Sequence, residues 1–199
     1  GRKDAIENYR PIFKLSVIPK LLDKIVNKYL FNSFKNYISL HQHGFYPGRS
    51  TSTNLIIYEN VCINSIEKGL RLNIDVLYTD YMKAFDRFGH TAILSKFENL
   101  GIQSTFLKWL KSYLLNRKVI MKVDNCISRA FVVNFGVPQG IHLGPLLFSL
   151  FVNDVSYIFN FCKVLLYADN IKIFATVKNL LIDLLLIVIR CRETFTDAD

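Results

Sequence analysis

The sequence predicts an α+β fold in which an antiparallel sheet is covered by helices on one face. Three observations favour this class. Residues 164–174 have the pattern of a β-hairpin, and helical and strand segments are grouped along the chain rather than strictly alternating. In addition, 51% of the 199 residues are hydrophobic, which suffices for one sizeable core.

The hairpin pattern is the clearest of the three. An apolar run, Val164 to Tyr167, is followed by Ala168-Asp169-Asn170 and then by a second run from Ile171 to Phe174. Asp and Asn favour turns because their short side chains bond to the local backbone and tolerate positive φ. The turn would hold a carboxylate at the tip of two strands, where a metal ligand can sit rigidly. An ordinary hairpin turn is the alternative.

The remaining elements follow from periodicity, caps and glycines. In chain order, the sequence predicts a helix from Ser16 to about 34, a loop at 42–53, a helix to about 68, a strand at 73–79, helices at 91–100 and 104–114, paired strands at 118–123 and 129–134, a glycine-rich loop at 136–145, a helix at 146–158, and a last helix at 177–194.

Composition indicates the class of partner. Lys and Arg number 25 against 16 Asp and Glu, a net charge of +9. A basic, aromatic-rich globular chain favours a nucleic acid partner, although a generally basic protein stays open because net charge does not locate the charge. The four cysteines are far apart, which indicates neither a zinc site nor a disulfide framework. The most apolar run, 180–189, contains Asp183 and is too short to span a bilayer.

Two carboxylates stand at strand ends or turns, Asp80 and Asp169. Carboxylates from separate strands can bind Mg²⁺, which prefers oxygen ligands and shares them with phosphates. The residues alone therefore favour a metal-dependent enzyme acting on nucleic acid, although spacing cannot show that Asp80 and Asp169 meet. Arg49, at a helix entrance, is either a phosphate ligand or a simple loop arginine. Phe148 is expected to be core rather than a ligand stacker.

Five motifs in order resemble the reverse transcriptase domain of non-LTR (LINE-type) retrotransposons, especially jockey-like elements of insects. The resemblance runs from about Lys3 to Phe174, and five motifs in order are far more specific than any one. The motifs are residues 7–12 (ENYRPI), 42–51 (QHGFYPGRST), 78–86 (YTDYMKAFD), 136–140 with 143–148 (GVPQG, LGPLLF), and 167–170 (YADN).

The resemblance implies a right-hand polymerase fold with fingers and palm, and a chain cut at both ends so that the thumb is absent. It implies one domain over 1–199, with fingers mainly in 1–70 and part of 90–133, and palm mainly in 71–89 and 134–199. The implied reaction is attack of a DNA primer 3′-hydroxyl on the α-phosphate of a dNTP, directed by an RNA template. Action in the nucleus is an implication of the same resemblance.

Site residues are carried over by position. Asp80 and Asp169 match the catalytic aspartates that hold two Mg²⁺ ions, with Mn²⁺ as an alternative. Phe85 matches the aromatic residue that would clash with a 2′-hydroxyl and so select dNTPs.

The other implied contacts concern the triphosphate, the template and the duplex. By the same resemblance, the triphosphate would be contacted by Lys3 and Arg10, the nucleotide and template by Gln139 and Gly140, and the nucleic acid by Arg49 and Lys118.

The departures from the family pattern bear on activity. Asn170 stands where the pattern has a second aspartate, Ile141 replaces a serine, and Tyr46 replaces an arginine. Asn in place of Asp removes a negative charge and introduces an NH₂ donor, so a rate loss of about 10²-fold or more is expected.

Three interpretations follow. The first is a working RNA-directed DNA polymerase. The second is a non-catalytic remnant that at most binds nucleic acid, which Asn170 and the missing thumb favour. The third is an RNA-directed RNA polymerase palm, against which Phe85 and the full motif set argue.

Overall fold

A computed structural model describes residues 11–67, 73–80, 84–87, 89–102, 104–159 and 162–177, with only the backbone of Asn73, Asp80 and Val177. These residues fall into two compact units, one drawn from the segments 1–38 and 81–153 and the other from 39–80 and 154–199. Lys3, Arg10 and residues 178–194 of the predicted last helix lie outside the described residues. Val177, where that helix was predicted to begin, is instead the last residue of a strand.

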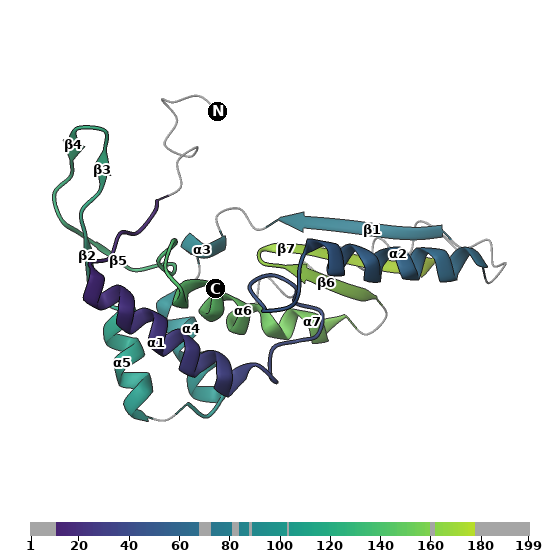
Figure 1. Cartoon of the computed structure of the whole chain (residues 1–199), viewed down its shortest axis with the longest axis horizontal. Coiled ribbons are helices and arrows are strands. Elements are labelled where there is room, and N and C mark those ends of the chain that lie inside the picture. The colour runs from purple at the N-terminus through teal and green to yellow at the C-terminus, as the bar shows by residue number, and fades with distance from the viewer. Residues whose placement is uncertain are drawn as a thin grey trace. The chain divides into compact units, whose positions relative to one another are not determined.

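The second unit is built on a three-stranded sheet (Figure 1). Its strands are β1 (Asn73–Asp80), β6 (Lys163–Tyr167) and β7 (Asn170–Val177), in the order β1-β7-β6. Both neighbouring pairs are antiparallel. The predicted antiparallel sheet and the predicted hairpin are therefore confirmed.

Strand burial differs from the expectation of a sheet covered on one face. Val164, Leu165 and Leu166 are consecutive in β6, and each is at most 3% exposed. Because neighbouring side chains point to opposite faces, both faces of this strand are buried. The continuous apolar run is the sequence signal for such a strand, whereas a half-exposed strand would alternate.

Helix α2 (Thr51–Glu67) and the short α7 (Val155–Ile158) contact β6. The Tyr58 ring of α2 meets Phe174 of β7 edge-on, with ring centroids 5.2 Å apart. The helix starts at Thr51, where Ser50 Oγ accepts a hydrogen bond from Thr53 N at 3.2 Å and so satisfies an otherwise unpaired N–H of the first turn.

The first unit is mainly helical and carries two small two-stranded sheets. Its helices pack through fully buried Leu, Ile and Phe side chains, and α6 contacts both α1 and α4. The elements are α1 (Val17–Phe34), α3 (Ala84–Arg87), α4 (His90–Asn99), α5 (Ser104–Leu114), β2 (Arg117–Val119), β3 (Lys122–Val123), β4 (Cys126–Ile127), β5 (Phe131–Val133) and α6 (Leu143–Phe151).

Two predicted elements differ in detail. The strand pair at 118–134 is divided into β2–β5 and β3–β4, which Figure 1 shows as one hairpin arm that turns at Asp124 with φ +51°. The helix predicted at 146–158 begins at Leu143 and is interrupted by a 3₁₀ turn, Val152–Asp154, before α7. Pro145 is compatible with the earlier start because the first helical turn needs no internal N–H donor.

Two further observations concern only the described ranges. No helix there combines the length and hydropathy needed to cross a membrane. Cys62, Cys126 and Cys162 are thiols rather than members of disulfides.

Candidate active site

The register of the sheet places the two sequence-predicted carboxylate segments side by side. Asp80, the last residue of β1, pairs with Asn170, the first residue of β7, and Asp169 precedes Asn170. Residues opposite each other in an antiparallel pair have Cα atoms about 4.5–5.5 Å apart. The spacing of the sequence could not reveal this proximity, because it follows from long-range strand pairing.

The hairpin turn is formed by Ala168 and Asp169. Ala168 is the residue with positive φ, at +56°, whereas the turn prediction assigned that tolerance to Asp169 and Asn170. The turn lies where the sequence predicted it, but the prediction of which residues tolerate positive φ there was wrong. Asn170 is not part of the turn, because it already pairs with Tyr167 as a strand residue. Asp169 is half-buried and Asn170 is exposed, so their side chains stand at the strand end.

The potential metal ligands that the structure describes at this strand end meet only part of what a divalent cation requires. Asp169 supplies a carboxylate, and the Asp80 backbone is adjacent, although the Asp80 side chain lies outside the described residues. The Asn170 Nδ2 amide lies 3.5 Å from Asp169 Oδ1, the outer limit of a hydrogen bond. Among the described side chains, no group of three or more His, Cys, Asp or Glu could hold a metal.

The loop at 41–44 lies along the end of β6. His43 N donates to Leu166 O, and Leu166 N donates to His41 O, both at 2.9 Å. Gln42 Oε1 accepts hydrogen bonds from Gly44 N at 2.8 Å and from Ala168 N at 3.2 Å. The second of the five motifs therefore contacts the turn that carries Asp169.

Arg49 holds this loop together. Its Nη1 donates to Ser39 O at 2.7 Å and Gln42 O at 2.6 Å, and its guanidinium carbon lies 3.7 Å from the centroid of the Tyr46 ring. These contacts within the loop agree with the interpretation of Arg49 as a simple loop arginine. Binding of phosphate by Arg49 stays a prediction. Burial and the nearby Arg49 charge lower the pKa of His43, whose Nδ1 hydrogen-bonds Thr53 Oγ1.

In the first unit, the glycine loop lies against α3. Val137 N donates to Phe85 O at 2.8 Å, and Gln139 Nε2 donates to Asp86 Oδ1 at 2.8 Å. The structure thus brings together Phe85 and Gln139, which the resemblance assigned to nucleotide binding. The Phe85 ring packs against the Phe148 ring at an interplanar angle of 35°, with ring centroids 4.4 Å apart. Phe148 is 2% exposed and is core, as predicted.

Two contacts anchor the ends of this arrangement. The Phe13 N–H donates to Gln139 O at 2.9 Å, which places the segment that follows Arg10 beside Gly140. His90 Nε2 donates to Gly136 O at 2.7 Å, and burial lowers the pKa of His90.

Asp23 is a structural residue that the sequence patterns did not reveal. It is 1% exposed, and its Oδ2 accepts from the N–H groups of His142 and Leu143, at 2.7 and 3.3 Å, at the start of α6. A carboxylate there is favoured by the helix dipole. The Tyr113 hydroxyl donates to Oδ1 at 3.1 Å, and burial together with this carboxylate raises the pKa of Tyr113. Its one sequence signal is that Asp23 is the only acidic residue in a helix whose other charged residues are lysines.

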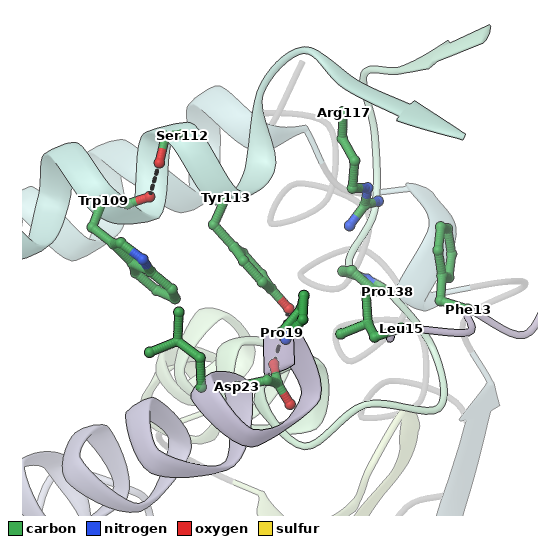
Figure 2. Close-up of a pocket in the computed structure, with 10 residues that line it drawn as sticks. Phe13, Leu15, Pro19, Asp23, Trp109, Ser112, Tyr113, Arg117 and Pro138 are labelled. Carbon is green, nitrogen blue, oxygen red and sulfur yellow. Dashed lines mark hydrogen bonds between the residues drawn. The ribbon is translucent and has the colours of Figure 1, made fainter. Parts of the chain in front are cut away.

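A pocket of about 230 Å³ lies between α1 and α5, beside Asp23. Figure 2 shows the residues that line it. Trp109 and Tyr113 line it, and Arg117 lies over the Phe13 ring at 4.6 Å. Small-molecule sites usually exceed about 300 Å³. None of the sequence-predicted site residues whose side chains the structure describes lines this pocket, so we assign it to helix packing. Lys118 is exposed on the hairpin arm, outside it.

Comparison with known proteins gives consistent matches. A family model described as reverse transcriptase (RNA-dependent DNA polymerase) matches residues 2–195. The probable RNA-directed DNA polymerase from transposon BS of Drosophila melanogaster is 32% identical over 155 residues, covering 77% of this chain and 17% of the relative. The RNA-directed DNA polymerase from mobile element jockey of Drosophila funebris is 29% identical over 152 residues, covering 75% and 16%. The chain spans about one-sixth of these relatives.

Solved structures agree at the level of the fold. Apo telomerase from Candida tropicalis, truncated from its C-terminal domain, superposes with a TM-score of 0.58 at 11% identity, covering 79% of this chain and 34% of that chain. The untruncated apo form gives a TM-score of 0.57 at 11% identity, covering 88% and 32%. At this identity the likeness concerns the fold alone.

Proposed function

The chain belongs to the reverse transcriptase (RNA-dependent DNA polymerase) family, and from that premise we propose that it is the fingers and palm of a retrotransposon RNA-directed DNA polymerase. The palm would comprise mainly 71–89 and 134–199, and the fingers mainly 1–70 with part of 90–133. These fingers and palm boundaries follow the resemblance to the family. They do not coincide with the boundaries of the two compact units. The thumb would belong to parts of the polymerase other than this chain.

The observation that carries the proposal is the pairing of Asp80 with Asn170. It puts the Asp80 backbone opposite the residue that follows Asp169, on a sheet in which Leu165, Leu166 and Ile171 near the hairpin turn are each at most 2% exposed. Two carboxylates at one strand end would hold Mg²⁺, or Mn²⁺, together with the oxygens of a triphosphate. The ions would supply activation of the primer 3′-hydroxyl and stabilisation of the leaving pyrophosphate.

The other residues would bind and orient the substrates. Phe85, held by its ring contact with Phe148, would exclude the 2′-hydroxyl of an rNTP. Gln139 and Gly140 would contact the nucleotide and template.

Cationic side chains would bind the phosphates. The residues proposed for the triphosphate are Lys3 and Arg10, and those proposed for the template–primer are Arg49 and Lys118.

Primer extension tests this proposal directly. On an RNA template with an annealed DNA primer, the chain should add dNTPs slowly in Mg²⁺ or Mn²⁺, with no addition once EDTA removes the metal. Addition of rNTPs should be much weaker, because Phe85 would clash with the 2′-hydroxyl. Synthesis that survives EDTA, or equal use of dNTPs and rNTPs, would contradict the proposed site.

A non-catalytic nucleic-acid-binding role is the second candidate, and the Asn170 amide beside Asp169 favours it. Here the affinity for an RNA–DNA hybrid should fall steeply with salt. If about six phosphates are contacted, the loss between roughly 50 and 200 mM salt is about 10³-fold. Fluorescence anisotropy of a labelled hybrid measures it, and an affinity independent of salt would argue against phosphate contacts.

A further inference from the structure

We propose that Gln42 is a positioning residue that fixes the turn carrying Asp169. The inference rests on the proposed function, because it names a residue that prepares the proposed metal site. Gln42 would not touch metal or substrate. It would act through the backbone of Ala168, the residue before the carboxylate.

The geometry of the Gln42 amide is specific. The side chain is 2% exposed, and its Oε1 accepts two hydrogen bonds, from Gly44 N at 2.8 Å and Ala168 N at 3.2 Å. Both partners are backbone N–H groups, so only the oxygen of the amide can face them. One side-chain atom therefore joins the loop of the second motif to the turn of the fifth.

The turn needs such a contact because of its backbone. Ala168 has φ +56°, a left-handed conformation that a residue with a Cβ adopts only at a conformational cost. A hydrogen bond to the Ala168 N–H offsets part of that cost. Since Asp169 is the next residue, the same bond restricts the direction of its carboxylate.

The other half of the Gln42 amide supports the assignment. Nε2 is buried and has no hydrogen-bond partner in the part of the chain that the structure describes. A buried unpaired donor is unfavourable, and an apolar side chain of the same size would avoid it. The presence of glutamine is therefore explained by its oxygen, which accepts from the turn.

The loop that carries Gln42 is also in direct contact with the turn at Ala168. A Cβ built on Gly44 would lie 2.2 Å from Ala168 N and 2.9 Å from Ala168 Cα. Together with the backbone bonds of His41 and His43 to Leu166, this contact keeps Gln42 in register with the hairpin.

Amide hydrogen exchange of the full chain, followed by NMR, tests the inference. Gln42→Met keeps the size and removes the acceptor, so the Ala168 amide should exchange about tenfold faster. Gln42→Glu keeps an oxygen acceptor and should preserve the protection. Asn54→Leu is the matched control, because Asn54 Nδ2 donates to Leu166 O at 3.2 Å on the same hairpin but away from the turn. It should leave Ala168 exchange unchanged.

A Mn²⁺ titration of the same proteins measures whether the loss of the Gln42 hydrogen bond weakens metal binding at Asp169. Paramagnetic broadening of the Asp169 amide signal should need several-fold more Mn²⁺ in Gln42→Met than in the parent or Asn54→Leu. Unchanged Ala168 exchange in Gln42→Met, or an unprotected Ala168 amide in the parent, would overturn the inference. Absence of broadening in every protein would instead overturn the proposed metal site, and the exchange data would still decide the role of Gln42.

Discussion

Asn170→Asp is expected to raise the rate of dNTP incorporation on a primed RNA template by about 100-fold or more. The change restores a negative charge at the strand end beside Asp169. It also removes the Nδ2 donor that now lies 3.5 Å from Asp169 Oδ1, so that both oxygens of Asp169 become free to accept a cation. Since Asn170 is exposed, the new carboxylate can be accommodated without burial.

Single-turnover primer extension in Mg²⁺ measures this effect, with parent and variant at equal concentration. Asn125→Asp is the control, since it makes the same change of charge in the exposed turn between β3 and β4, and it should leave the rate unchanged. A rate equal to the parent's in Asn170→Asp would show that Asn170 is not the decisive lesion. Equal gains in both variants would point to a general effect of net charge.

The hairpin shows which structural features could be predicted from the sequence and which could not. Two apolar runs around a polar turn predicted β6 and β7 correctly, because strand formation there depends on local pattern. The same pattern misassigned the residue with positive φ, since alanine rarely adopts a positive φ, as Ala168 does here. Its stabilising partner, Gln42, is 126 residues away along the chain. No local pattern encodes such a partner.

Asp23 shows the same limit in the first unit. It accepts from His142 N over a separation of 119 residues, and its contact starts α6 at Leu143, three residues before the predicted start. The resemblance, in contrast, assigned Phe85 and Gln139 to nucleotide binding without any structural information, and that role stays a prediction. It did not indicate that Asp86 would accept the hydrogen bond from Gln139 that holds the side chain in place.

Gly136→Ala is expected to destabilise the chain by about 3 kcal/mol. Gly136 has φ +74°, and a Cβ there would lie 2.5 Å from Phe85 O and 2.6 Å from Asp86 Cα. Both contacts are with backbone, which cannot move aside as a flexible side chain can. The glycine loop would have to leave α3, which breaks the bond from Val137 N to Phe85 O and the bond from Gln139 to Asp86.

Gly101→Ala separates the clash from backbone strain. Gly101 has nearly the same conformation, φ +76°, but nothing lies within 4 Å of the Cβ position. It should therefore cost only about 1 kcal/mol, the price of a left-handed residue alone. Urea unfolding followed by circular dichroism measures both variants. The difference between them, about 2 kcal/mol, reports the close approach of the glycine loop to Phe85 and Asp86, and equal destabilisation would mean that the loop is not held against α3.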